Sequence, residues 1–232
     1  MDYLVEHSDH FDLIDLCNIP AGAPILALLP PLLEASNFQV NVWQQEVSPV
    51  IQLPSDWEAY LEMLDKKQRH EVRRKLRRIT GQNFEVTWRY EQPQTPEEWA
   101  SLKERFFGLM RASGEDKQRF LEDPQNVDFF AHLLPTMAEQ GWLLLSVLQI
   151  DGRDAVAYCS FDYEGRVLLY NTGQDLDYYA EYSTGSVLLA YIIRDAIERG
   201  RQVFDFLRGD ERYKYHMGGQ DTAVLGISAQ RP

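Results

Sequence analysis

The chain has 232 residues, 44% of them hydrophobic and 25% charged, which excludes an intrinsically disordered protein and leaves room for one large domain or for one domain plus part of another. The longest apolar run, residues 23–33, is too short to span a bilayer, and the acidic first residues are unlike a secretory signal, so we expect no membrane segment and a cytoplasmic location. Two cysteines cannot build a disulfide framework, and we expect Cys17 and Cys159 to be reduced core thiols.

The net charge of −13 is unevenly distributed along the chain. Residues 66–78 contain eight basic residues and one acid, a local charge of +7, so the remainder of the chain carries −20. An acidic body argues against a general nucleic-acid-binding protein. The basic segment predicts either a contact with an anionic partner or a solvated helix that pairs with the acidic body.

The first 53 residues are expected to form a strand, a helix and a second strand, at residues 11–17, 25–36 and 38–42, followed by a short extended piece at 49–53. A β-α-β fragment of this size cannot bury a core of its own. Its open strand edges predict a covering partner, which a homodimer formed through residues 1–53 would supply.

Residues 54–232 are expected to form a second, larger domain. Caps and apolar periodicity predict helices at residues 54–64, 66–79, 95–112 and 125–139, with a further helical stretch after the polar loop 113–117. Alternating patterns predict strands at residues 84–90, 142–150, 154–163 and 167–172. The last predicted elements are a helix at 183–200, a strand at 203–207, a short helical piece at 212–217 and a strand at 223–229.

The order of these elements predicts an α+β fold with a mixed, mostly antiparallel sheet flanked by helices. Two-residue turns, Asp151-Gly152 and Glu164-Gly165, connect three antiparallel strands. The strand-helix-strand unit from residue 167 to residue 207 is expected to be a right-handed parallel crossover.

This order resembles the GNAT acetyltransferase superfamily, and three stretches resemble one branch of it, the acetyltransferase-like domain of cellulose-biosynthesis-associated proteins, which is related to the Fem-type aminoacyl transferases. KKQRHEVRRKLRR at 66–78 resembles the basic helix that introduces the domain, YSTGSVLL at 182–189 the turn into the cofactor helix, and FDFLRGDERYK at 204–214 the late strand and following turn. The resemblance covers about 54–230. It implies a GNAT-like fold, acetyl-CoA or another acyl-CoA as co-substrate, no metal, a link to bacterial cell-envelope polysaccharide, and a remnant of a preceding similar domain at 1–53.

The turn into the cofactor helix departs from the superfamily pattern at two of three positions. The general loop reads Gln or Arg, two residues, Gly, one residue, then Gly or Ala, and here Tyr182, Gly185 and Val187 stand at these positions. A turn before a long helix still offers backbone N–H groups and a positive helix end to a pyrophosphate. The alternative is a capped helix whose glycine contacts no ligand. The residues expected to hold the cofactor are Ser183, Thr184, Gly185 and Ser186.

Two tyrosines and one aspartate are candidate catalytic groups. GNAT enzymes often use a Tyr after the fifth strand to protonate the departing thiolate, which points to Tyr213, or to Tyr215. Asp205, a carboxylate in an apolar strand, is either a general base or a structural acceptor for hydrogen bonds from the turn that follows it. Lys214 and Arg208 are candidate contacts for the CoA phosphates or for an anionic acceptor.

The acidic, tyrosine-rich loop 175–182 is a candidate surface for a cationic amine, through charge and cation–π contacts of Asp175, Asp177 and Tyr179. An ordinary solvated loop is the alternative. The histidines near the start of the chain lack the spacing of metal ligands, and we expect no metal.

Three functions follow from these patterns. The leading hypothesis is an acyl-CoA-dependent N-acyltransferase, in which a small-molecule amine attacks the thioester directly. One alternative is a tRNA-dependent aminoacyl transferase of the Fem type, which would give the basic helix a partner. The other is a binding or scaffold domain without catalysis, which the departures at the cofactor turn favour.

Overall fold

The computed structural model describes Tyr3, His7 and residues 10–232. Contacts divide the chain into two compact units. The first contains the residues up to Val50 together with Leu207–Tyr215 and Gly219–Pro232, and the second contains Ile51–Phe206 and His216–Gly218.

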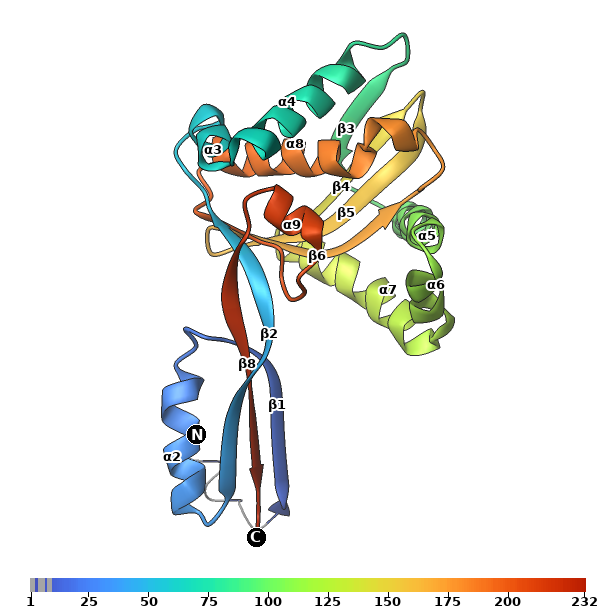
Figure 1. The fold of residues 1–232 in the computed structure, drawn as a ribbon. Helices are drawn as coiled ribbons and strands as arrows, with labels where there is room; N and C mark the ends of the chain where they lie inside the picture. The colour runs from blue at the N-terminus through green and yellow to red at the C-terminus, as the bar shows by residue number, and fades with distance from the viewer. Residues whose placement is uncertain (1–2, 4–6, 8–9) are drawn as a thin grey trace. The chain divides into compact units, whose positions relative to one another are not determined.

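The first unit is a three-stranded antiparallel sheet with one helix packed on it, visible in blue and red in Figure 1. Its elements are β1 (Leu13–Pro20), α2 (Ile25–Ala35), β2 (Gln39–Gln52, which ends just inside the second unit) and β8 (Gln220–Gln230). Strand β8 lies between β1 and β2 and pairs with both. Leu29 and Leu33 of α2 are buried in a core that includes Phe38 and Ile227. The last strand therefore belongs with the N-terminal strands, whereas the sequence grouped it with the larger domain.

Two details of the first unit differ from the sequence predictions. Strand β2 is one continuous strand instead of two separate pieces, because β8 pairs with it from Gln39 to Val50 across a single bulge. Cys17 is exposed on β1, so the prediction of two core thiols is wrong for this residue and confirmed for the buried Cys159.

The second unit contains five strands that are neighbours in the order β7-β6-β5-β4-β3 of an eight-stranded sheet. Neighbouring strands are antiparallel except for β6 and β7, which are parallel, so the predicted mixed, mostly antiparallel fold is confirmed. The strands are β3 (Val86–Tyr90), β4 (Leu143–Ile150), β5 (Arg153–Tyr163), β6 (Arg166–Gln174) and β7 (Val203–Asp205). Its helices are α3 (Trp57–Met63), α4 (Lys66–Thr80), α5 (Pro96–Ala112), α6 (Glu115–Glu122), α7 (Pro124–Glu139) and α8 (Thr184–Glu198), with a 3₁₀ turn, η2 (Ala180–Tyr182), before α8. The short helix α9 (Arg212–His216) follows β7 in the chain and, apart from His216, belongs to the first unit.

Helices cover both faces of this sheet. The core beneath α5 and α7 contains Phe106, Phe107 and Phe130 together with Leu145 and Val147, alternate residues of β4. Helix α8 packs on β4 and β5, and α4 runs beside α8 (Figure 1). In the part of the chain that the structure describes, no helix is long and apolar enough to cross a membrane.

Helix α4 begins at a capping aspartate and is fixed by a thin apolar seam. The Asp65 side chain accepts a hydrogen bond of 2.8 Å from the Gln68 backbone N–H. Val72 and Ile79 are buried on the side that meets α8. Most of the basic residues therefore occupy the rest of the helix surface.

Gly173 of β6 supplies the first prediction, because it lies directly against α5. A Cβ at this position would be 2.7 Å from the Met110 backbone nitrogen and 2.8 Å from Leu109 Cβ. Since a backbone atom cannot move aside cheaply, we expect Gly173→Ala to lower the free energy of unfolding by about 1–3 kcal/mol, measured by urea denaturation. The matched control is Gly108→Ala in α5, where a Cβ meets nothing within 4 Å and should stabilise the helix by about 0.5–1 kcal/mol. Equal stability of the two variants would show that β6 and α5 are not in this close contact.

Candidate functional site

Strand β6 extends well beyond its pairing with β7. The two strands pair only from Arg166 to Leu168, opposite Val203–Asp205, whereas β6 continues to Gln174. Just past the last pair, Tyr170 is an extra residue in the ladder between β6 and β5, a bulge of the kind often found beside active sites. Among the described residues, no strand pairs with β6 on the β7 side after Leu168.

The open part of β6 is suited to an extended ligand. A strand edge without a partner strand presents N–H and C=O groups that can pair with a chain of amides. Several groups are already used. Lys117 of α6 donates to the Thr172 carbonyl at 2.7 Å and also binds the Asn171 side chain. The Thr172 N–H donates to Asn171 Oδ1, and Ser113, at the C-terminal end of α5, binds both backbone groups of Gln174. The stretch of β6 just beyond Leu168 is therefore the part of this edge where strand-like pairing with a ligand would start.

The first turn of α8 contains the four residues expected to hold the cofactor. Ser183 has φ +55° and makes no side-chain capping hydrogen bond, so no cap occupies the first N–H groups of the helix. Thr184 and Gly185 are buried, whereas Ser183 and Ser186 are half-buried. The accessible part of the turn is therefore Ser183 and Ser186.

Gly185 is explained by close packing within the protein. A Cβ at this position would be 2.5 Å from Gln174 Oε1 and 3.2 Å from the Tyr158 hydroxyl. Tyr158 donates to the Gly185 carbonyl at 3.0 Å, and Gln174 Nε2 donates to Thr184 Oγ1 at 3.2 Å. The end of β6 and the start of α8 are thus joined directly, and the glycine is needed for that contact whether or not a ligand binds.

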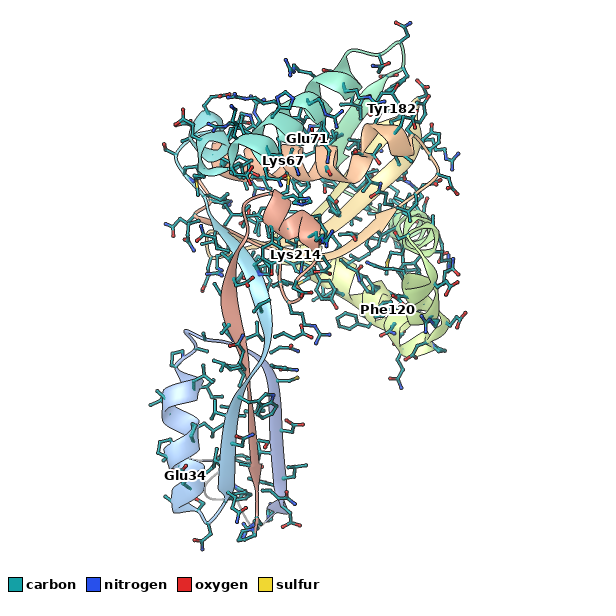
Figure 2. All side chains as sticks on the ribbon, in the orientation of Figure 1. Glu34, Lys67, Glu71, Phe120, Tyr182 and Lys214 are labelled. Carbon is teal, nitrogen blue, oxygen red and sulfur yellow. The ribbon has the colours of Figure 1, made fainter. Side chains whose placement is uncertain are left out.

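The basic helix and the cofactor turn, which the sequence treated separately, are brought together. Lys75 Nζ donates to Ser186 Oγ at 3.1 Å, and Arg78 Nη1 donates to the Glu181 carbonyl at 2.9 Å. The Arg78 guanidinium lies 4.9 Å from the centroid of the Tyr182 ring. Figure 2 shows Tyr182 close to the start of α8. Burial between the two helices lowers the pKa of Lys75.

Lys75, Arg78, Gln174 and Tyr158 were not among the residues predicted from the sequence. Only Lys75 gave a signal that could have been used, because it falls on the apolar seam formed by Val72 and Ile79 and must therefore face a neighbouring element.

The acidic loop before α8 is held in place by its own carboxylate and phenols. Asp175 binds Arg153 at 2.5 Å and accepts hydrogen bonds from two backbone N–H groups of its loop. The hydroxyls of Tyr178 and Tyr179 bind the Ile150 carbonyl and the Asp151 carboxylate, respectively. Asp177, which was predicted with Asp175 and Tyr179 to contact the acceptor amine, is exposed.

Asp205 is part of an ion pair at the point where β6 and β7 are still joined. Its side chain is nearly buried and lies 3.1 Å from Arg166 Nη2 of β6. Arg166 lies on the neighbouring strand. The ion pair agrees with the structural interpretation of Asp205, and its role as a general base stays a prediction.

Tyr213 and Tyr215 belong to the first unit and differ in their surroundings. Burial, with a smaller contribution from Glu211, raises the pKa of Tyr213. Tyr215 donates a hydrogen bond of 2.7 Å to Asp221, which raises its pKa to about 12. Both phenols therefore remain protonated at neutral pH, and the Tyr215 proton is directed at a carboxylate.

Lys214 and Arg208, the other two predicted phosphate contacts, also lie in the first unit. Lys214 is 2% exposed, and its ammonium group donates to three backbone carbonyls, those of residues 207, 208 and 209, at 2.8–3.1 Å. Glu211 lies 2.8 Å from the same nitrogen. Because all three N–H donors have partners, Lys214 serves to hold this turn and offers no donor to a phosphate. Arg208 is exposed.

A groove of about 1070 Å³ is lined by residues of α3 and α4. Its floor includes Trp57 and Leu61, and five basic residues line it against two acids. The five are Lys66, Lys67, Arg69, Arg73 and Arg77. Arg73 pairs with Glu58, whereas the first three form no ion pair with any residue that the structure describes.

Comparison with known proteins gives one family and a set of similar folds. The acetyltransferase (GNAT) domain family matches residues 66–215, more than half of the chain, and the match begins at the first residue of α4. No curated protein matches the sequence.

Several solved structures have a similar fold. The crystal structure of FemX has a TM-score of 0.67 at 11% identity, over 98% of this chain and 75% of that one. L-PGS from Bacillus licheniformis gives 0.63 at 11% identity, over 99% and 71% of the two chains, and a conserved protein of unknown function from Bacteroides thetaiotaomicron gives 0.62 at 13%, over 99% and 74%. At such low identity these likenesses show the fold alone.

The contact at the start of α8 can be tested with a double-mutant cycle. We expect Gly185→Ala to destabilise the protein by about 1–2 kcal/mol, because the new Cβ displaces the Gln174 side chain. In a Gln174→Ala background the same change should cost at least about 1 kcal/mol less, since the nearest obstacle has been removed. Thermal or urea unfolding of the four chains measures the coupling. The same cost in both backgrounds would contradict the packing explanation.

Proposed function

Because the chain belongs to the GNAT acetyltransferase family, we propose that it transfers an acyl group, in the first place acetyl, from acyl-CoA to the amine of a small molecule. The observation that carries this proposal is that β6 loses its partner strand β7 after Leu168 and then leads to the start of α8, which has no side-chain cap. The stretches that resemble the cellulose-associated branch favour an amine connected with cell-envelope polysaccharide.

The residues at this site fit the parts of CoA. The stretch of β6 beyond Leu168, which has no partner strand on the β7 side among the described residues, suits the amides of the pantetheine arm. The turn at Ser183 and Ser186 suits the pyrophosphate, because uncapped N–H groups and the positive end of a helix attract anions. Since Gln174 and Tyr158 fill the space beside Gly185, the ligand would contact the two serines and not the glycine.

Acyl-CoA supplies an activated carbonyl: transfer forms a C–N bond, breaks the C–S bond, and moves one proton from the amine to the departing sulfur. We assign the proton donor to Tyr213, the tyrosine that the family resemblance implies for this role, because a phenol is protonated at neutral pH and can donate to the departing sulfur. Tyr215 is the weaker candidate, since its proton is hydrogen-bonded to Asp221. Asp177 remains the exposed carboxylate of the loop for an acceptor ammonium.

The groove between α3 and α4 favours a second candidate, a transferase that takes its group from a charged tRNA. Four cations without ion-pair partners among the described residues, Lys66, Lys67, Arg69 and Arg77, line the groove together with an indole ring, a combination suited to phosphates and bases. The overall charge of −13 opposes this function, and for that reason it ranks second.

A homodimer through residues 1–53 stays a prediction.

Calorimetric titration with acetyl-CoA and with CoA tests the proposal. We expect binding in the micromolar range, as is usual for enzyme substrates, with roughly 1:1 stoichiometry. Absence of binding to both would overturn the acyl-CoA proposal and would leave the tRNA-dependent candidate, to be tested by electrophoretic mobility shift.

The role of Tyr213 is tested by comparing Tyr213→Phe with Tyr215→Phe. We expect Tyr213→Phe to lower the rate of CoA thiol release in the presence of a panel of primary amines by about 10²-fold, with unchanged affinity for acetyl-CoA, because only proton donation is lost. Tyr215→Phe should change the rate much less. The reverse order would transfer the role to Tyr215.

A further inference from the structure

The turn into α8 lacks a polar group that the superfamily pattern provides. Where the general loop begins with Gln or Arg, this chain has Tyr182. In the structure α4 brings a cation to this position. The guanidinium of Arg78 lies over the Tyr182 ring and donates to the neighbouring Glu181 carbonyl. Lys75, one helical turn earlier on α4, reaches Ser186 in the first turn of α8.

We propose that α4 is the phosphate clamp of the acyl-CoA site, with Lys75 and Arg78 as the cations that bind the CoA phosphates. The inference rests on the proposed function and adds to it the source of the positive charge. It gives the basic helix, which begins where the family match begins, a place in the binding of the co-substrate.

The hydrogen-bonding capacity of these side chains supports the assignment. A lysine ammonium has three donors and an arginine guanidinium has five, and the structure gives each of these two side chains one acceptor. Ser186 accepts from Lys75, so its own O–H remains a donor. Charge-assisted hydrogen bonds to phosphate are about twice as strong as neutral ones.

The other cations of α4 are directed elsewhere. Arg73 pairs with Glu58 at 2.5 Å and Arg74 with Glu71 at 2.7 Å. Lys67 and Arg77 line the groove on the α3 side. The helix therefore offers matched controls, since a change at Lys67 or Arg77 removes the same charge from the same helix without touching the turn into α8.

The experiment compares Lys75→Met and Arg78→Gln with Lys67→Met and Arg77→Gln. Met and Gln preserve most of the volume, and circular dichroism and thermal unfolding confirm that each variant is folded. Calorimetry with acetyl-CoA should show affinity about tenfold weaker, or more, for each of the first two variants, and within about twofold of the wild type for the controls. Lys75→Arg should restore most of the affinity, and the salt dependence of binding should decrease in the first two variants.

The possible results distinguish the proposed role of Lys75 and Arg78 from the proposed acyltransferase function. Unchanged affinity in Lys75→Met and Arg78→Gln, with a wild-type chain that binds acetyl-CoA, would overturn the clamp and leave the proposed function intact. Equal weakening in all four variants would also overturn it, because the effect would then be that of net charge alone. A wild-type chain that binds neither acetyl-CoA nor inorganic pyrophosphate would overturn both.

Discussion

The structure of the candidate site depends on a parallel strand pairing that lasts for only three residues. Parallel neighbours require a crossover, and α8 supplies it between β6 and β7. Because the pairing ends at Leu168, no strand of the described residues pairs with the rest of β6 on that side. The same crossover brings the start of α8 back to the end of β6, where Gln174 contacts Thr184. Strand edge and helix start are therefore consequences of one topological choice.

The contacts at the start of α8 separate the structural part of the turn from the part suited to a ligand. Gly185 is fixed by Gln174 and Tyr158, so its small size is no sign of a bound phosphate. Ser183 and Ser186 are half-buried, and Lys75 of α4 donates to Ser186, so anion binding at this turn would depend on these side chains. Gly185 thus lies within the candidate binding turn, but packing inside the protein explains why this residue is a glycine.

The basic helix divides its charge among three tasks. Arg73 and Arg74 form ion pairs with nearby glutamates, Lys75 and Arg78 reach the turn into α8, and the remaining cations face the groove beside α3. Exposed ion pairs contribute little to stability, so they do not by themselves explain a segment of +7 in an acidic chain. Two of the three tasks place positive charge where an anion can reach it.

The sequence by itself determined the fold class, the order of the elements and the parallel crossover, because alternation, helical periodicity and turn residues are local properties of the chain. It also identified the turn at residues 183–186 and the basic helix as separate features. Only the tertiary structure decided that Lys75 and Arg78 meet this turn, that Lys214 is enclosed by three carbonyls, that Asp205 pairs with Arg166 across two strands, and that β8 joins the N-terminal strands. Each of these contacts joins different elements or closes a turn, and their geometry depends on packing that a residue pattern along the chain does not contain.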